Sequence, residues 1–206
     1  MKFYPNRERQ LGVAAVEAAL LLPLLMLLLF GMIDAARALQ ANIIMTNIGR
    51  EGANLVSRSG IDLEDGAQDV IYALMASAPP LDVNKQGMVY ITRLMGVTAN
   101  GVTNNVIVDQ YRWDDASRKL GASFSGYRPT SKVYSCTGWN TANGQCTSIS
   151  STKRPPTTIL SGKLDNGEVV YVVETFYRYD MLFTGFAVGG LSLADFGPDL
   201  YSFTVF

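Results

Sequence analysis

The sequence contains no histidine and only two cysteines among its 206 residues. The lack of histidine excludes Ser-His-Asp and Cys-His catalytic arrangements and histidine-based metal centres, and two cysteines alone are too few for a zinc site. Gly185, Gly189 and Gly190 lack the spacing and the following lysine of a phosphate-binding loop. We therefore expect a protein that is not an enzyme and that needs no metal and no cofactor.

Charged residues are also scarce, at 17% of the chain, and the formal net charge is −1. Such a balance provides no basic surface, so we do not expect nucleic acid as a partner. Charge is scarcest between Val13 and Ile33, where Glu17 is the one ionisable residue in a run dominated by leucine.

A helix the length of this apolar run would span roughly 30 Å, the thickness of the hydrocarbon core of a bilayer. Its apolar side chains favour insertion by about 4 to 7 kcal/mol, whereas an ionised carboxylate at the helix centre costs about 2.5 to 3.5 kcal/mol. Insertion is therefore favoured despite Glu17. An ionisable residue inside a membrane segment indicates a functional site.

Two fates of the run remain open on these grounds. In one, it is a secretory signal peptide cut at Ala36-Arg37-Ala38, although its apolar core is longer than such signals have. In the other, it stays in the membrane, with Lys2, Arg7 and Arg9 holding the amino end in the cytoplasm and the rest of the chain outside.

The residues around Glu17 point to a family. The segment from Gly12 to Pro23, GVAAVEAALLLP, follows a short basic leader, and NIGREGA follows from Asn47 to Ala53. Together they resemble the TadE-like minor pilins of tight-adherence (Tad) pili. The resemblance implies cleavage between Gly12 and Val13 by a membrane prepilin peptidase. The new ammonium of Val13, or that of a neighbouring subunit, would then pair with Glu17 and lower the cost of its charge.

The resemblance further implies a minor pilin, or pseudopilin, that acts in the initiation, assembly or tip display of a Tad pilus used in surface adhesion. Its partners would be the prepilin peptidase, other major and minor pilin subunits, and the pilus assembly machinery of the inner membrane. The protein would cross the bacterial inner membrane once, with its carboxyl-terminal domain in the periplasm, and could enter the extracellular pilus. The alternative is a signal-anchored periplasmic binding or structural protein that never enters a filament.

The apolar run is predicted to continue as a helix to about Val56. Pro23 should bend or locally open this helix, because proline lacks the backbone donor and clashes with the preceding turn. Beyond the run, Ile44, Ile48, Gly52 and Leu55 recur at spacings of three and four, as in an amphipathic helix. The stretch from Ser57 to Gly60 should end it.

The remaining chain is long enough for one domain with its own core. A second helix is predicted from Leu63 to Ser77, ended by Pro79-Pro80. Strands are predicted at Met88–Val97, Val106–Trp113, Glu168–Leu182 and Leu200–Phe206, the first two joined through the turn sequence Asn100-Gly101. The fold class is therefore α+β: a leader (residues 1–12), a membrane and stem helix (13–58), and an extracytoplasmic domain with a second helix and an antiparallel sheet (59–206).

Cys136 and Cys146 enclose the segment TGWNTANGQ within a stretch from Gly121 to Gly162 that is rich in Ser, Thr, Gly, Asn and Pro. This composition predicts a long surface loop. In an extracytoplasmic domain we expect the two cysteines to form a disulfide, whereas a cytoplasmic domain would keep two free thiols. Trp139 is either a contact residue for a partner or a cover for the disulfide.

Overall fold

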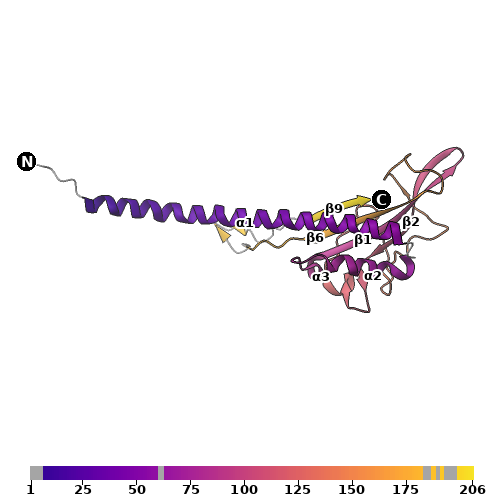
Figure 1. The fold of residues 1–206 in the computed structure, drawn as a ribbon, viewed down its shortest axis with the longest axis horizontal. Coiled ribbons are helices and arrows are strands. Elements are labelled where there is room, and N and C mark those ends of the chain that lie inside the picture. The colour runs from indigo at the N-terminus through magenta and orange to yellow at the C-terminus, as the bar shows by residue number, and fades with distance from the viewer. Residues whose placement is uncertain (1–6, 60–62, 183–186, 189–190, 193–198) are drawn as a thin grey trace, which may run out of the picture. The chain divides into compact units, whose positions relative to one another are not determined.

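The computed structural model describes residues 7–59, 63–182, 187–188, 191–192 and 199–206. It confirms the predicted α+β class, with a long apolar helix followed by a small domain that holds a second helix and an antiparallel sheet (Figure 1). The chain divides into two compact units. The helix unit comprises Met1–Gln40 with Met181–Phe196, and the sheet unit comprises Ala41–Asp180 with Gly197–Phe206.

The first helix, α1 (Arg7–Ser59), is continuous through Pro23 and contributes residues to both units. It ends within the predicted break from Ser57 to Gly60. A bend at Pro23 stays a prediction. The first half of the predicted leader, residues 1–6, lies outside the described residues, and the boundary after Gly12 also stays a prediction.

The sheet unit is built on five antiparallel strands in the order β5-β2-β1-β6-β9. Their bounds are Gly87–Ala99 (β1), Val102–Arg112 (β2), Pro156–Thr157 (β5), Val169–Arg178 (β6) and Asp199–Val205 (β9). The hairpin between β1 and β2 turns at Asn100-Gly101, where both residues have positive φ, 52° and 77°. Type I′ hairpin turns require positive φ at both central residues, and this requirement explains why Asn and Gly stand there. The strand predicted at Glu168–Leu182 is β6, which ends at Arg178, and the strand predicted at Leu200–Phe206 is β9.

The carboxyl-terminal part of α1 and the helix α2 (Leu63–Ala76) pack on one face of this sheet. The side chains of α1 that are buried there recur at helical spacing; they are Ala41, Met45, Ile48, Ala53 and Val56. Glycine allows the closest approaches: a methyl group at Gly49 would lie 3.2 Å from Oγ1 of Thr204, and one at Gly52 would lie 2.7 Å from Cδ1 of Leu74.

The predicted apolar stripe of α1 was therefore right at Ile48 and Gly52 but wrong at Leu55, which is 41% exposed. Ile44 is half-buried. The buried face also uses small residues, Ala41, Gly49 and Ala53, which the predicted stripe left out and which let the helix lie close to the strands.

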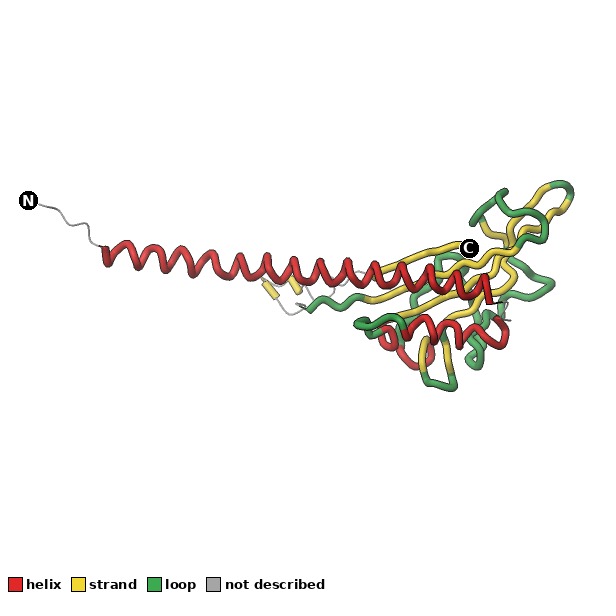
Figure 2. Tube along the Cα trace, viewed as in Figure 1, coloured by secondary structure: helices red, strands yellow, loops and turns green. Residues whose placement is uncertain are grey.

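The opposite face of the sheet is covered by the long connection between β2 and β6, which contains only short elements (Figure 2). Its apolar core comprises Leu94, Ile107, Leu164, Val170 and Val172, with Val133, Tyr134, Ile149, Ile159, Leu160 and Val205 packed around them. The predicted surface loop is thus only partly on the surface, since Tyr127, Ser131 and Cys146 are buried.

Six short elements complete the described secondary structure. They are α3 (Val83–Gln86), α4 (Ala122–Ser125), the paired strands β3 (Asp114–Asp115) and β4 (Leu120–Gly121), and the paired strands β7 (Ala187–Val188) and β8 (Leu191–Ser192).

Candidate assembly site on the amino-terminal helix

The apolar run of α1 is exposed except at Phe30, which is half-buried. From Val13 to Ile33, no side chain is buried, and Leu20, Leu25 and Met32 are 72%, 62% and 65% exposed. Among the described residues, α1 is the one helix long and apolar enough to cross a membrane. Its exposure rules out one competing explanation, because a core helix of equal hydrophobicity would be covered by its own domain.

The residues predicted to form the processing and assembly site all lie on α1. Gly12 lies within the helix, and Val13 and Glu17 are exposed and one helical turn apart. Side chains at this spacing share one helix face. In the part of the chain that the structure describes, Glu17 makes no ion pair. The helix therefore presents a single carboxylate on an apolar surface, and the backbone amide of Val13 becomes a cation near it only if the chain is cut after Gly12.

The two cysteines of the sheet unit form a disulfide, with Cα atoms 6.0 Å apart. Trp139 pairs through its backbone with Cys146, and its ring lies 5.7 Å from that of Tyr90 and 4.9 Å beneath the guanidinium of Arg112. These contacts hold the half-buried indole against the sheet. Of the two roles predicted for Trp139, partner contact and cover for the disulfide, neither is tested by these contacts, which place the ring against Tyr90 and Arg112.

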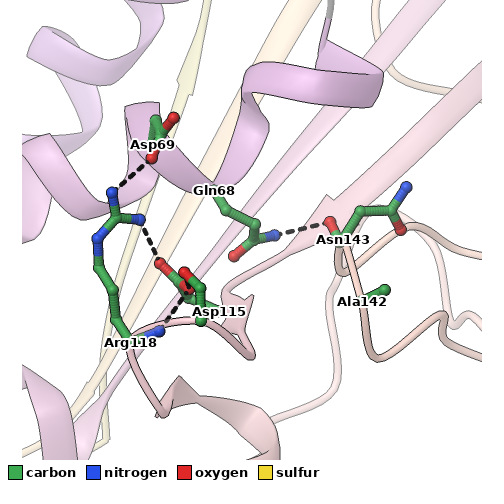
Figure 3. A pocket seen from close by; sticks show the side chains of 7 residues that line it. Gln68, Asp69, Asp115, Arg118, Ala142 and Asn143 are labelled. Carbon is green, nitrogen blue, oxygen red and sulfur yellow. Dashed lines mark hydrogen bonds and ion pairs between the residues drawn. The ribbon is translucent and has the colours of Figure 1, made fainter.

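A pocket of about 210 Å³ opens where α2, the β3–β4 turn and the disulfide loop converge (Figure 3). Gln68 binds across it, donating from Nε2 to the carbonyl oxygens of Arg112 and Asn143, both at 2.8 Å, and accepting at Oε1 from the amide of Asp114 at 2.9 Å. The half-buried amide side chain of Gln68 thus ties the disulfide loop to the helix.

Arg118 fills the other side of the pocket, with ion pairs of 2.6 Å to Asp115 and 2.7 Å to Asp69 (Figure 3). These bonds raise the pKa of Arg118. Burial alone would raise the pKa of Asp115, but hydrogen bonds from Ser117 and Arg118 outweigh it and lower that pKa below its usual value. Every charge here has an internal partner, so the pocket fastens three segments together rather than presenting a free group for chemistry.

Sequence reasoning missed a buried carboxylate, Glu174 in β6, which has no exposed surface. Its oxygens accept hydrogen bonds from the Ser131 hydroxyl, from the Lys132 amide at 2.9 Å and from the Tyr201 hydroxyl at 3.1 Å. Burial raises the pKa of Glu174, and these three donors partly offset that rise. The signal in the sequence was a glutamate inside an alternating apolar strand, where a carboxylate needs partners.

Ser131 extends this network to β2, because its hydroxyl oxygen accepts from Nε2 of Gln110 at 2.9 Å. The hydroxyl of Tyr90 donates to the carbonyl of Pro129 in the same loop. Burial raises the pKa of this tyrosine to about 12, despite the nearby guanidinium of Arg112. These hydrogen bonds hold the loop that contains Pro129 and Ser131 against the sheet, and we assign the network a structural role.

An exposed apolar helix with one carboxylate, continuing into a small α+β domain, defines a class of protein: chains with one amino-terminal helix that is long and apolar enough to cross a membrane. Comparison with known families gives a more specific likeness: residues 12–54 match the family model described as TadE-like protein. The match begins at Gly12, includes Glu17, and confirms the resemblance over this amino-terminal part of the chain. No curated protein and no solved structure matches the chain.

Proposed function

We propose that this chain is a minor pilin, or pseudopilin, of a Tad-type pilus. The proposal is supported by a combination found in one segment. Gly12 and Glu17 lie on an apolar helix whose side chains are largely exposed, and the segment that contains them matches the TadE-like family. A signal-anchored protein has no need of the glycine or the carboxylate at these positions.

In the proposed mechanism, the apolar part of α1 inserts in the inner membrane with the leader in the cytoplasm. A prepilin peptidase then hydrolyses the bond between Gly12 and Val13, which leaves an ammonium on Val13. Glu17 lies one turn further along the helix, so it can pair with this ammonium or with that of an adjacent subunit. A paired charge in a low dielectric costs far less than a lone one, so the pairing sets the register of neighbouring helices.

The partners in this proposal are the peptidase, the major and minor pilin subunits, and the assembly machinery of the inner membrane. The sheet unit lies in the periplasm, where an oxidising environment suits its disulfide. The protein contributes to initiation, assembly or tip display, and its role is structural rather than catalytic.

The amino terminus of the mature protein tests the processing step. We expect mass spectrometry of the protein from its native membrane to find Val13 as the first residue. An intact Met1 would contradict processing and favour a simple anchor, and a start at Leu39 would indicate cleavage as a secretory signal. Gly12→Leu should abolish the cut, whereas Gly31→Leu, on the same helix, should leave it unchanged.

Glu17→Ala tests assembly separately from insertion. Removing the carboxylate takes away a cost of insertion, so we expect membrane levels to be equal or higher. The amount of pilus recovered by shearing should nevertheless fall, because the registering charge is lost. Glu51→Ala, which removes an exposed carboxylate from the part of α1 in the sheet unit, is the matched control. Normal piliation with Glu17→Ala would refute the role of Glu17.

A further inference from the structure

The membrane boundary can be located on α1 from its charges. The apolar run fills roughly 30 Å of helix, which matches the hydrocarbon core, and Asp34 is the first charged residue after it. When the run spans the bilayer, Asp34 therefore lies at the outer edge of the hydrocarbon, at the level of the lipid headgroups. Arg37 follows one turn later.

A distant part of the chain is bonded to the helix at this level. The backbone amide of Leu182 donates a hydrogen bond of 3.0 Å to Oδ1 of Asp34, and both residues belong to the helix unit. Asp34 is only 6% exposed. This bond fixes the depth of Leu182 relative to the apolar run, whatever the orientation of the sheet unit.

The side chain held at this depth is apolar and uncovered, because Leu182 is 56% exposed. The sequence that continues from it, MLFTGFAVGGLSLA from Met181 to Ala194, contains no charged residue. Within that sequence, β7 and β8 pair with each other as antiparallel strands (Figure 2), so part of their backbone has partners inside the protein. Paired backbone and uncharged sequence are what the boundary between headgroups and acyl chains accepts.

We propose that the chain has a second contact with the membrane, in which Leu182 and the strands β7 and β8 rest in the headgroup region of the outer leaflet. The occupant of this surface is lipid, because a group at the level of Asp34 on a single membrane helix is surrounded by headgroups. The segment carries no charge, so contact does not require anionic lipid. The inference rests on the proposed function in one respect: it applies to the anchored subunit before it enters a filament.

Single thiols on the full-length protein test this contact. The native cysteines are paired, so an added cysteine is the reactive one. The Leu182→Cys variant is labelled with an environment-sensitive fluorophore and reconstituted in phosphatidylcholine vesicles. One set of vesicles contains lipids with a nitroxide quencher at the headgroup, and a second set contains lipids with the quencher deep in the acyl chain. Val102→Cys, at the tip of the β1–β2 hairpin, is the matched negative control, since Val102 is 58% exposed and Leu182 is 56% exposed. Leu21→Cys, inside the apolar run and also 56% exposed, is the positive control.

We expect the label at position 182 to shift to shorter wavelength and to be quenched severalfold more by the headgroup quencher than the label at position 102. The label at position 21 should be quenched most by the deep quencher. A label at 182 that behaves like the one at 102, while position 21 lies deep, would overturn the second contact and leave the anchor intact. If position 21 is also unquenched, the anchor itself is wrong and both proposals fall.

Discussion

The helix unit and the sheet unit depart from the usual distribution of polarity in opposite directions. The helix unit exposes an apolar run in which Leu20 is 72% exposed, while the sheet unit buries carboxylates, among them Glu174 and Asp114 with no exposed surface. In the sheet unit the exception is explained within the chain, because Glu174 has three hydrogen-bond donors and Asp114 is bonded to Arg112 at 2.5 Å.

In the helix unit no such internal explanation exists for the described part of the apolar run. A surface of this kind is stable only if its surroundings are apolar, that is, lipid or other apolar helices. The comparison teaches that α1 has two parts in different surroundings: the apolar run from Val13 to Ile33 is largely exposed in the described chain, and the part from Ala41 to Val56 is buried against the sheet. The same kind of substitution should therefore have opposite consequences in the two parts.

Truncation of a large side chain should give the largest contrast. Met45 has no exposed surface, and its backbone carbonyl accepts a hydrogen bond from Thr175 in β6. We expect Met45→Ala to lower the free energy of unfolding of the sheet unit by about 2 to 5 kcal/mol, through lost burial and a cavity. Leu21→Ala removes a side chain of similar size where the chain itself provides no cover, so that stability should not change.

Chemical denaturation of both variants in detergent, followed by tryptophan fluorescence, measures the contrast, because Trp113 is buried in the sheet unit. Equal losses for the two variants would show that the apolar run is part of the same core, contrary to the division into two units.

Enlargement of a glycine should give the next largest contrast. A methyl at Gly52 would lie 2.7 Å from Leu74, whereas one at Gly31 would have nothing within 4 Å. Gly52→Leu should therefore destabilise the sheet unit by about 1 to 3 kcal/mol, since the helix must move away from α2. Gly31→Leu should leave the sheet unit unchanged, so thermal unfolding should separate the two variants. A stable Gly52→Leu protein would mean that α1 does not pack closely on α2.

The elements that sequence reasoning found are those with local signals. The helices from Arg7 to Ser59 and from Leu63 to Ala76 follow from composition and periodicity, and the β1–β2 hairpin follows from Asn100-Gly101. What it missed depends on residues far apart in the chain. Glu174 is satisfied by a hydroxyl 43 positions earlier, and the close face of α1 depends on which strand lies against Gly49. No local pattern encodes such pairings.

The candidate site divides in the same way. Gly12, Val13 and Glu17 were singled out because their spacing along one helix is itself the signal, and their roles stay predictions. The predicted disulfide between Cys136 and Cys146 is present in the structure. The cation expected to pair with Glu17 came from the family resemblance and not from a pattern in the chain, since it would arise only after cleavage behind Gly12 or would belong to another subunit.

The buried carboxylate provides the smallest but most specific contrast. Burial raises the pKa of Glu174. Its carboxyl group is therefore still protonated in the folded protein at pH values where it is ionised in the unfolded chain. The contribution of Glu174 to stability is therefore full below its unfolded pKa and is lost as the pH rises through the raised folded pKa. Asp115 acts in the opposite sense, because its pKa is lowered and its contribution is lost as the pH falls.

Glu174→Gln keeps the shape of the side chain and removes the charge. We expect the variant to gain stability relative to the wild type as the pH rises from about 4 to about 8, because only the wild type must then hold an ionised group in the sheet. Urea unfolding at several pH values measures this difference, with Glu51→Gln as the control at an exposed carboxylate of α1. A constant difference between Glu174→Gln and wild type across that range would mean that Glu174 does not titrate differently in the folded and unfolded states. The burial of charge in the sheet unit would then be fully compensated by its three donors, and the two units would differ only in where their apolar surface lies.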